Sequence, residues 1–267
     1  GIAVNMMPVK KAGDLFQVVN LVLFSPEDLN IVKDGPSARR KFINLELSQV
    51  DKIYYKDLCD YTKCLTQRNA LLKNINLKKA VEDELDIWDE QLSYFGKKVS
   101  LRRNSFISEL NEIIRDIHFR ITGGKENLKL CYEPNLSGEN FSDILKKNRE
   151  KDLKYQTTNS GPHRDDVCIM INDRDVRVFG SQGQIRSAAL SLKLAEISII
   201  RDKNNDVPVL LLDDVLSELD RQRQKLLLSE INGLQTIITC TGLDDFVNNS
   251  FEADKLFNVV NGKVYQK

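Results

Sequence analysis

The chain has 267 residues, with 39 Lys and Arg balanced by 39 Asp and Glu, so its formal net charge is zero. This length suits one large domain or two ordinary ones, and an apolar content of 41% is enough for a buried core. A neutral chain has no overall positive field, so a polyanionic partner must be bound by a local basic patch.

The five cysteines indicate a reducing, cytoplasmic setting, because they are widely spaced and odd in number. Cys59 and Cys64 have no second Cys or His pair at zinc-ligand spacing, so a metal centre is not expected there. The sequence has no apolar run of membrane-spanning length and no signal-peptide pattern. Gly1 in place of Met indicates a processed chain or one that begins within a longer protein.

The first predicted elements precede residue 37. Residues 17–24 are apolar and rich in β-branched side chains, which predicts a buried strand. Ser25 is a suitable N-cap for a short helix over 26–32 that begins with Pro26. Asp34-Gly35-Pro36 ends that helix and opens the next.

Two long helices are predicted next. One extends from Ser37 to Lys73 without Gly or Pro, and the second from about Leu77 to Ile121, interrupted only by Gly96. A helix of about 35 residues reaches roughly 50 Å, longer than a compact domain needs. The pair predicts an antiparallel helical arm, with a plain helical bundle as the alternative. The expected heptad seam consists of Tyr55, Leu58, Thr62, Leu65, Asn69 and Leu72 on the first helix and Leu85, Trp88, Leu92, Phe95, Val99, Arg102 and Phe106 on the second.

Strands and helices alternate after the arm, which Gly123-Gly124 should end. We expect a strand over 128–132, a polar helix over 140–157, a hairpin of 167–171 with 175–179, an amphipathic helix over 186–201, a fully buried strand over 209–212, a helix over 219–232, a strand over 236–241 and a hairpin of 256–260 with 263–265. This alternation is typical of an α/β layer with a parallel sheet.

Two carboxylates, Asp213 and Asp214, end the strand predicted over 209–212. Phosphate-binding α/β folds place acids at the carboxyl edge of a sheet in this way. Asp213 is a candidate ligand for Mg²⁺ bound to nucleotide phosphates, and Asp214 a candidate base for the attacking water. The alternative is that either residue only caps the following turn.

A small polar loop, Gly180-Ser181-Gln182-Gly183-Gln184, precedes the helix predicted over 186–201. Backbone N–H groups, a hydroxyl and a helix N-terminus together suit an anion, and Gly183 permits close approach of the backbone. An ordinary N-cap at Ser181 is the alternative. The order of loop, helix, buried strand, two acids and Ser217-Glu218-Leu219-Asp220 favours a nucleotide site.

Basic pairs on the arm and its flanks are candidate DNA contacts, although a solvated helix face explains most of them equally well. The pairs are Arg39-Arg40-Lys41, Lys78-Lys79, Lys97-Lys98, Arg102-Arg103 and Lys146-Lys147 with Arg149 and Lys151. Charge reversal at Arg102 and Arg103 is expected to show whether a patch lies on the arm. His163, in a turn after Ser160-Gly161-Pro162, has no second ligand nearby, and no Ser/His/Asp hydrolase arrangement is evident.

With these motifs in this order, the chain resembles the RecF family of bacterial recombination mediators over essentially its whole length. The resemblance is carried by residues 22–29, Gly35-Pro36 with residues 39–42, residues 160–166, residues 180–184, residues 210–220 and residues 235–239. It implies a partial ABC/SMC-like ATPase head of α/β class with an inserted antiparallel helical arm. The implied division is an N-terminal lobe remainder over 1–36, an arm domain over 37–158 and a C-terminal lobe over 159–267.

The resemblance also implies ATP-dependent dimerisation on DNA, weak ATP hydrolysis and cooperation with RecO and RecR in loading RecA at gaps. Ser181, Gly183 and Gln184 match the signature loop that meets the γ-phosphate on the opposite protomer. Asp213 matches the Mg²⁺-linked acid, Asp214 the catalytic acid, and Ser217 to Asp220 the loop that crosses the dimer interface. Where many ABC proteins carry a switch His, this chain has Thr239-Cys240-Thr241.

One motif of the family, a Gly-x-x-x-x-Gly-Lys-Ser/Thr phosphate loop, does not occur in these 267 residues. We therefore expect a chain that starts partway through the first lobe and does not hydrolyse ATP alone. The first hypothesis is a RecF-like repair ATPase without its N-terminal segment. The second is a non-enzymatic DNA- or protein-binding module with the arm as its docking surface.

Overall fold

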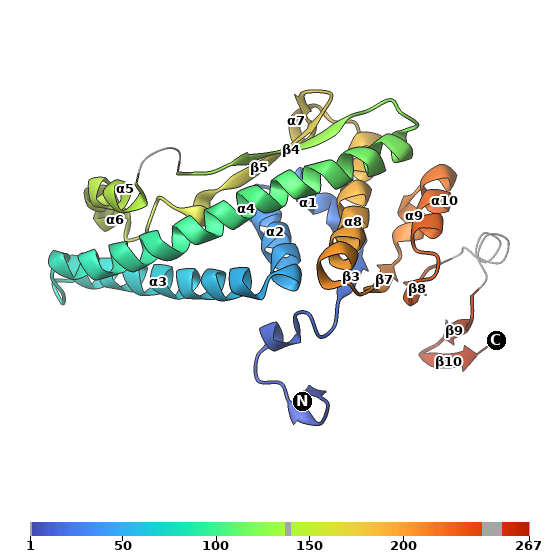
Figure 1. Ribbon diagram of the computed structural model, residues 1–267, viewed down its shortest axis with the longest axis horizontal. Helices are drawn as coiled ribbons and strands as arrows, with labels where there is room; N and C mark the ends of the chain where they lie inside the picture. The colour runs from blue at the N-terminus through green and yellow to red at the C-terminus, as the bar shows by residue number, and fades with distance from the viewer. Residues whose placement is uncertain (1, 137–139, 242–252, 267) are drawn as a thin grey trace.

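A computed structural model describes residues 2–136, 140–241 and 253–266 of the chain. Figure 1 shows α3 and α4 as a long arm on one side, with α8 to α10 and the parallel strands on the other. The strands are β1 (Ala3–Val4), β2 (Met7–Pro8), β3 (Leu21–Phe24), β4 (Leu128–Glu133), β5 (Asp166–Ile171), β6 (Arg174–Asp175), β7 (Val209–Asp213), β8 (Thr236–Thr239), β9 (Phe257–Val260) and β10 (Lys263–Gln266). The α-helices are α1 (Leu29–Lys33), α2 (Pro36–Val50), α3 (Lys52–Asn76), α4 (Leu85–Thr122), α5 (Phe141–Lys147), α6 (Arg149–Tyr155), α7 (Val176–Phe179), α8 (Gln182–Asn204), α9 (Val215–Glu218) and α10 (Arg221–Glu230). Short 3-10 helices are η1 (Ala12–Leu15), η2 (Pro26–Asp28), η3 (Glu82–Glu84) and η4 (Pro162–Arg164).

The α/β part is built on a parallel sheet in the order β3-β7-β8, as the alternation of strands and helices predicts. Leu21 of β3 pairs with Val209 of β7, and Leu210 of β7 pairs with Thr236 of β8. This register brings the carboxyl ends of the three strands to one edge, where Asp213 lies opposite Thr239.

Three strand predictions in this sheet need correction. The strand predicted over 17–24 begins only at Leu21, because Gln17 has a left-handed backbone (φ 63°) that breaks the extended chain. The strand predicted as fully buried alternates instead, with Leu210 and Leu212 buried and Leu211 half-buried, so only one face of the sheet is fully covered. The strand predicted over 236–241 ends at Thr239.

Helix α8 is central rather than amphipathic, contrary to the sequence prediction. Its buried residues occur on all sides, because it packs against the arm helix α4, the helices α1 and α2 and strand β3. Even Lys193 and Glu196 are buried, and they form an ion pair of 2.6 Å. A helix surrounded in this way fixes the position of its own N-terminus relative to the arm.

The arm begins with two helices, not the single helix predicted from Ser37 to Lys73. Asp51 has an extended backbone (φ −137°), and its carboxylate accepts the N–H groups of Ile53 and Tyr54, each at 2.9 Å. This N-cap ends α2 and starts α3 in a new direction, so that α2 crosses the end of α3 in Figure 1.

The second part of the arm agrees with the predicted antiparallel hairpin. Helix α3 packs along α4 and ends at Asn76, beyond the predicted end at Lys73. Helix α4 begins at Leu85 and continues through Gly96 without a break. It ends before Gly123, whose left-handed backbone (φ 63°) is the expected C-terminal signal.

The seam of α4 is confirmed at Leu85, Leu92, Val99 and Phe106, all of which are buried. On α3 the predicted seam is displaced by one residue. Of the six residues predicted there, only Leu72 is buried, and Thr62 is exposed. The residues that α3 buries at heptad spacing are Tyr54, Asp57, Tyr61, Cys64, Arg68 and Leu71. Several are polar and have partners outside the hairpin, which an apolar repeat cannot show.

A second, antiparallel sheet, β4-β5-β6, covers α4 where the arm meets the α/β part. The predicted hairpin is confirmed only in part, because its second strand stops at Asp175. The Asp175 carboxylate accepts the Arg177 N–H at 2.8 Å and starts α7 instead of a longer strand. The polar segment predicted as one helix over 140–157 divides at Asn148 into α5 and α6.

The C-terminal elements agree with the predictions more closely. Strands β9 and β10 form the expected hairpin, and Asn261 (φ 50°) and Gly262 (φ 75°) give it a turn with two left-handed residues. The helix predicted over 219–232 corresponds to α10, which the Asp220 side chain caps.

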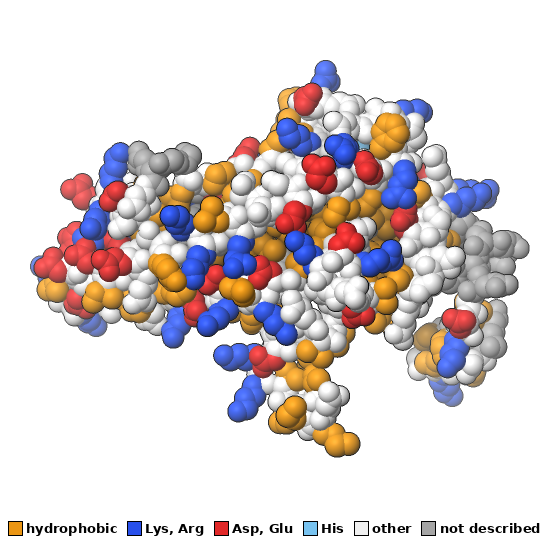
Figure 2. Space-filling model, in the orientation of Figure 1, with side chains coloured by type: hydrophobic (Ala, Val, Ile, Leu, Met, Phe, Trp, Pro, Cys, Tyr) orange, Lys and Arg blue, Asp and Glu red, His pale blue; other side chains and the backbone are white. Residues whose placement is uncertain are grey.

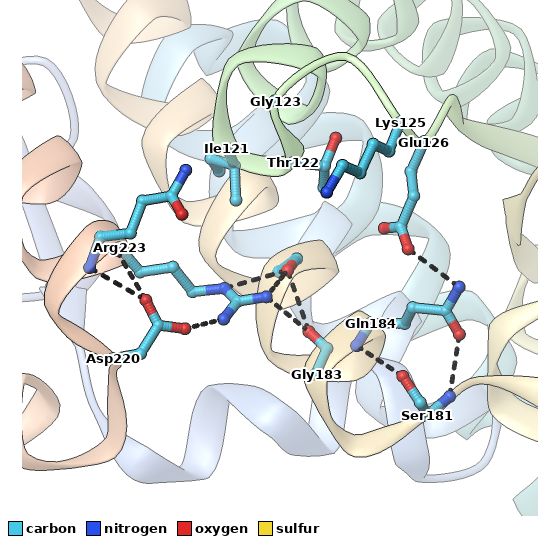
Figure 3. A pocket seen from close by; sticks show the side chains of 12 residues that line it. Ile121, Thr122, Gly123, Lys125, Glu126, Ser181, Gly183, Gln184, Asp220 and Arg223 are labelled. Carbon is cyan, nitrogen blue, oxygen red and sulfur yellow. Dashed lines mark hydrogen bonds and ion pairs between the residues drawn. The ribbon is translucent and has the colours of Figure 1, made fainter.

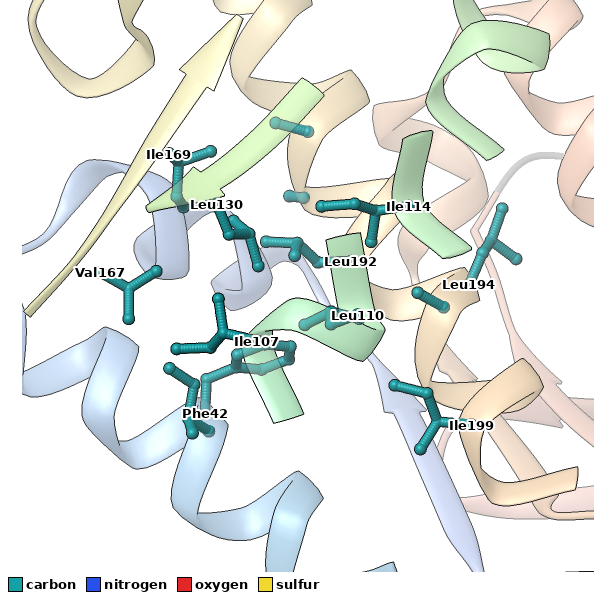
Figure 4. Packing of buried hydrophobic residues seen from close by; sticks show 14 of the residues in the cluster. Phe42, Ile107, Leu110, Ile114, Leu130, Val167, Ile169, Leu192, Leu194 and Ile199 are labelled. Atoms are coloured by element: carbon teal, nitrogen blue, oxygen red, sulfur yellow. The ribbon is translucent and has the colours of Figure 1, made fainter. Parts of the chain in front are cut away.

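A buried apolar cluster joins the base of the arm, the antiparallel sheet and α8. Figure 4 shows Ile107, Leu110 and Ile114 of α4 gathered with Leu130 of β4 and Leu192 of α8. Each buried side chain of this size contributes roughly 1.5–3 kcal/mol to stability.

The predicted division of the chain into domains over residues 1–36, 37–158 and 159–267 stays a prediction.

Candidate functional site

The acidic pair at the sheet edge has one oriented and one unpaired carboxylate. Thr239 Oγ1 donates to Asp213 Oδ1 at 2.6 Å, and the Asp214 N–H donates to the Thr239 carbonyl at 3.1 Å. Thr239 thus orients the Asp213 side chain and holds the backbone of Asp214. This contact holds Asp213 with its second oxygen available at the exposed end of β7.

Asp214 does not behave as a simple helix cap. It has a left-handed backbone (φ 51°) at the N-cap position of α9, yet its side chain makes no capping hydrogen bond. Its Oδ1 atom is buried and has no hydrogen-bond partner among the described residues. A strained backbone that holds an unsatisfied carboxylate oxygen is the kind of feature that marks functional sites. The geometry therefore favours a ligand-binding role over the capping alternative for Asp214.

The signature loop adopts a complete capping box at the start of α8. Ser181 Oγ accepts the Gln184 N–H at 3.2 Å, and Gln184 Oε1 accepts the Ser181 N–H at 2.9 Å. The N-cap predicted as the alternative is therefore present. It does not occupy the whole helix end, because the N–H groups of Gln182 and Gly183 have no acceptor within a helix.

Gly183 keeps that helix end open. A Cβ atom at Gly183 would meet no heavy atom closer than 3.9 Å, so the glycine is not required for internal packing. Its backbone is free to approach a ligand, and backbone N–H groups at a helix N-terminus suit phosphate oxygens. The residues at the start of α8 thus fit a nucleotide phosphate. Asp213, at the edge of the parallel sheet, fits a hard cation such as Mg²⁺.

The loop at residues 181–184 and Asp220 meet at a pocket of about 300 Å³ (Figure 3). The lining comes from the end of α4, the loop after it, the N-terminus of α8 and the start of α10: Ile121, Thr122, Gly123, Lys125, Glu126, Ser181, Gly183, Gln184, Ser187, Asp220, Gln222 and Arg223. Four predicted residues, Ser181, Gly183, Gln184 and Asp220, are thereby brought together.

Asp220 is held rigidly at the edge of this pocket. Its carboxylate accepts the N–H groups of Gln222 at 3.1 Å and Arg223 at 3.0 Å and forms an ion pair with the Arg223 guanidinium. The Arg223 N–H, together with that guanidinium, lowers the pKa of the Asp220 carboxyl. Asp220 is therefore an anion across the neutral pH range.

The predicted site residues fall into two groups. The pocket lining does not include Asp213, Asp214 or Ser217. Ser217 Oγ donates to the Asp214 carbonyl at 2.7 Å and so belongs with the acidic pair. An ion pair of 2.8 Å between Arg186 and Glu218 connects α8, which begins at the pocket, to α9, which follows the acidic pair. One chain does not enclose all of the predicted residues in one cavity.

Arg223 is a site residue that the sequence prediction missed. Its Nη2 atom donates to Ser187 Oγ at 2.6 Å and to the Gly183 carbonyl at 3.3 Å, which ties α10 to the signature loop. The sequence did contain an indication of this role. A positive charge in the first turn of a helix is unfavourable because it opposes the helix dipole, so Arg223 is expected to have a partner elsewhere.

A Ser-His-Glu arrangement was also missed, since its members are far apart in the sequence. His118 lies between Ser191 Oγ, at 2.8 Å from Nδ1, and Glu126 Oε2, at 3.3 Å from Nε2. It is not a hydrolase triad, because Ser191 is fully buried, with its Oγ atom 2.8 Å from the Ser187 carbonyl as well as from His118 Nδ1.

The turn around His163 is a structural junction between the arm and the rest of the fold. His163 Nε2 lies 2.9 Å from the Thr158 carbonyl and Nδ1 lies 2.6 Å from the Tyr61 hydroxyl of α3. The described residues contain no cluster of three or more metal-ligating side chains. Burial lowers the pKa of His163 to about 4, so its imidazole is neutral at pH 7.

Several arginines in the basic pairs serve this junction rather than a surface patch. Arg103 is buried and donates to Asp165 Oδ2 at 2.9 Å, and Arg39 pairs with Asp166 at 2.7 Å. Arg102 is ion-paired with Asp51. Charge reversal at Arg102 and Arg103 is therefore the wrong test for a DNA patch, since it would place an unpaired buried charge in the core.

The side chains that remain as candidate DNA contacts are exposed lysines. Figure 2 shows basic and acidic side chains interspersed along the arm, with acidic ones gathered near its tip, where Glu82, Asp83 and Glu84 are exposed. Lys146, Lys147 and Lys151, on α5 and α6, are all exposed. No helix of the described residues is long and apolar enough to cross a membrane.

Comparison with curated proteins gives relatives of high identity. The chain is 53% identical over 266 residues to the DNA replication and repair protein RecF of Lachnospira eligens, covering 99% of this chain and 73% of the relative. It is 55% identical over 264 residues to RecF of Agathobacter rectalis and 46% identical over 269 residues to RecF of Clostridium botulinum, in each case spanning 73% of the relative. No family model matches the chain.

Solved structures give the same result for the fold. A structure of the recombination mediator protein RecF with ATP in the RecFOR pathway matches at a TM-score of 0.88 with 37% identity, covering 98% of this chain and 71% of that one. A second structure, of RecF with ATPrS, matches at a TM-score of 0.87 with 37% identity and the same coverage of both chains. The predicted α/β fold, an ATPase head with an inserted helical arm, is confirmed. By sequence and by fold, this chain belongs to the RecF family of DNA replication and repair proteins.

Proposed function

We propose that this chain acts in DNA replication and recombinational repair as a protein that binds ATP between two of its copies. The observation that carries this is the separation of its nucleotide-facing residues. Ser181, Gly183 and Gln184 open onto one pocket, whereas Asp213 and Asp214 stand at the carboxyl edge of the parallel sheet. A second copy would bring its pocket against the acidic edge of the first.

Each group has a role that follows from its chemistry. The Ser181 hydroxyl and the N–H groups at the start of α8 would bind the terminal phosphate. Asp213, oriented by Thr239, would hold Mg²⁺, which neutralises phosphate charge when bound. The Asp214 carboxylate would accept a proton from the attacking water. Ser217 and Asp220 would lie at the contact between the two copies.

The predicted weak ATPase activity depends on a further element. These 267 residues contain no Gly-x-x-x-x-Gly-Lys-Ser/Thr sequence, so they do not supply a phosphate loop. We expect the chain by itself to hydrolyse ATP slowly or not at all. Binding between two copies is therefore the part of the proposal to test first.

The proposed partners follow from the relatives, one of which is titled a recombination mediator in the RecFOR pathway. We propose that this cytoplasmic chain binds DNA at gaps or at junctions of single and double strands. It would act with RecO- and RecR-like mediators to load the RecA recombinase. Any DNA contact must come from local lysines, because the net charge is zero.

Sedimentation velocity with and without ATP and Mg²⁺ tests the proposal. Wild-type chain should shift towards a dimer with ATP. Ser181→Arg should abolish the shift by filling the phosphate position, whereas Asp214→Asn should dimerise at least as well as wild type, because it removes a negative charge near the phosphates. Glu112→Ala, at an exposed arm position, is the matched control. A dimer whose formation is independent of ATP and of Ser181 contradicts the proposal.

The second candidate is a non-enzymatic DNA- or protein-binding module, and the missing phosphate-loop sequence favours it. Titration of the chain with ATP and, separately, with duplex DNA distinguishes the two. Salt-dependent DNA binding without measurable ATP binding supports the module. ATP binding that Ser181→Arg weakens supports the first proposal, in which ATP is bound between two copies.

A further inference from the structure

The loop that leaves the arm touches the signature loop through one acidic side chain. Gln184 Nε2 donates to Glu126 Oε1 at 3.0 Å, and Gln184 Oε1 accepts the Ser181 N–H at 2.9 Å. Glu126 lies four residues after the end of α4 and two residues before β4. Figure 3 shows Glu126 pointing from this loop to Gln184 across the pocket edge.

His118 fixes the other oxygen of Glu126. It lies in the last turns of α4, is fully buried, and has Nε2 at 3.3 Å from Glu126 Oε2. Its Nδ1 atom lies 2.8 Å from Ser191 Oγ, four residues beyond Ser187 on α8. The arm helix and the signature helix thus hold one imidazole from opposite sides.

The proton positions follow from charge and burial. Burial lowers the pKa of His118, and Arg223 opposes its protonation, so the imidazole is neutral at pH 7 although Glu126 favours the charged form. A neutral imidazole has one N–H and one lone pair. Because Glu126 only accepts, Nε2 must carry the proton, and the one hydrogen of the Ser191 hydroxyl is then directed to Nδ1 rather than to the Ser187 carbonyl, which lies at the same 2.8 Å. The opposite tautomer would set a lone pair against a carboxylate.

Both ends of the Glu126 loop are anchored. Gly123 and Gly124 have left-handed backbones (φ 63° and 78°) that turn the chain out of α4. Asn127 N–H donates to Asn172 Oδ1 at 2.9 Å, and Asn172 N–H donates to the Asn127 carbonyl at 3.0 Å. A shift of α4 is therefore passed to Glu126 rather than absorbed by a loose loop.

From these contacts we infer that Glu126, held by His118, is a positioning residue that couples the base of the helical arm to the signature loop. It orients Gln184 and, through Gln184, the backbone of Ser181. The nucleotide-facing geometry of that loop would then depend on the position of the arm, and ATP between two copies would in turn fix the arm. This last consequence rests on the proposed function, whereas the link itself does not.

Hydrogen exchange of the nucleotide-free chain tests the link. Glu126→Ala removes both contacts, so the hydrogen-bonded amides of Ser181, Gln184 and Ile185 should exchange about tenfold faster, the size expected for a lost hydrogen bond to a charged group. Glu126→Gln keeps an acceptor for Gln184 and should restore most of the protection. Glu112→Ala should exchange as wild type does. Unchanged exchange at 181–185, or acceleration that is equal throughout the chain, overturns the inference.

Nitrogen-15 chemical shifts of the His118 ring give an independent test. The wild-type chain should show the neutral tautomer protonated at Nε2, and Glu126→Ala should move the proton to Nδ1, where Ser191 Oγ accepts it. A wild-type ring protonated at Nδ1, or one insensitive to Glu126→Ala, overturns the inferred contact.

ATP-dependent dimerisation tests the consequence. If wild-type chain dimerises with ATP, Glu126→Ala should need about tenfold more ATP for half-maximal dimer, and Glu126→Gln should lie close to wild type. Equal ATP dependence of wild type and Glu126→Ala overturns the coupling. If wild type does not dimerise with ATP, the proposed function fails, and exchange at 181–185 still decides the inference about Glu126.

Discussion

The Tyr61 hydroxyl lies 2.6 Å from His163 Nδ1, and this contact joins the arm to the 3-10 helix η4, which leads into β5 of the antiparallel sheet. Both side chains are largely withdrawn from water, and His163 Nε2 also lies 2.9 Å from the Thr158 carbonyl. That carbonyl can only accept, so Nε2 carries the proton and Tyr61 donates to Nδ1. The arm is thus attached through a neutral imidazole.

The first prediction concerns acid stability. Burial lowers the pKa of His163 from 6.5 to about 4. Between these values the unfolded chain binds a proton that the native chain does not, so stability is full above pH 6.5 and falls as the pH drops towards 4. By pH 5 this residue should account for a loss of about 2 kcal/mol. Urea unfolding of wild type and His163→Gln at pH 7 and pH 5 measures it.

The comparison with His163→Gln is needed because other groups titrate in the same range. Burial raises the pKa of Glu46 to about 7, which makes the native state lose stability as the pH rises. Glu46 contributes to both proteins, so its effect cancels in their difference. Identical pH dependence of wild type and His163→Gln would show that His163 is not held neutral.

The second prediction concerns the buried ion pairs of the arm. Arg68 is fully buried and donates to Asp89 at 2.6 Å and to Asp152 at 2.7 Å. Arg68→Ala leaves the buried Asp152 carboxylate without its cation and Asp89 with Arg149 alone, and should cost about 3–5 kcal/mol. Arg115→Ala removes an exposed pair and should change stability by less than about 0.5 kcal/mol. Chemical denaturation of the two variants measures the difference, and similar losses would contradict the role of burial.

The third prediction uses two glycines with opposite surroundings. A Cβ at Gly96 would lie 2.6 Å from Phe141 and 3.2 Å from Tyr61, so Gly96→Ala should destabilise by about 1–3 kcal/mol despite the better helix propensity of Ala. Gly183→Ala has open space and should leave the melting temperature unchanged. The same Gly183→Ala change should weaken ATP-dependent dimerisation, because the methyl group blocks approach of a phosphate.

Thermal melts and sedimentation with ATP check both glycines. A stable Gly96→Ala protein would show that Phe141 gives way without cost. A Gly183→Ala protein that dimerises as wild type does would remove Gly183 from the proposed phosphate contact.

The fourth prediction concerns DNA. Lys146, Lys147 and Lys151 are exposed, whereas the neighbouring Arg149 is taken by ion pairs with Asp86 and Asp89. Changing the three lysines to Glu should weaken duplex binding at low salt by at least tenfold and flatten its salt dependence. Fluorescence anisotropy over a salt series measures both quantities. A matched change at Lys10, Lys11 and Lys263 should have a smaller effect, and an equal effect would place the DNA elsewhere.

The sequence by itself determined most of the order of strands and helices, the acidic edge at Asp213 and Asp214, the cap at Ser181 and the turn at Asn261-Gly262. These features rest on local physics. An apolar run followed by acids, an N-cap serine and a left-handed turn pair each act within a few residues of chain. Local patterns are therefore sufficient to predict them.

Only the tertiary structure decided which residues meet. The buried face of α3 includes Arg68 and Asp57, whose partners come from elsewhere in the chain, so an apolar heptad places the seam one residue away. The contacts of His118 with Ser191 and of Glu126 with Gln184 join residues 73 and 58 positions apart. Burial of polar groups becomes favourable once distant partners satisfy them, and no local pattern records where those partners are.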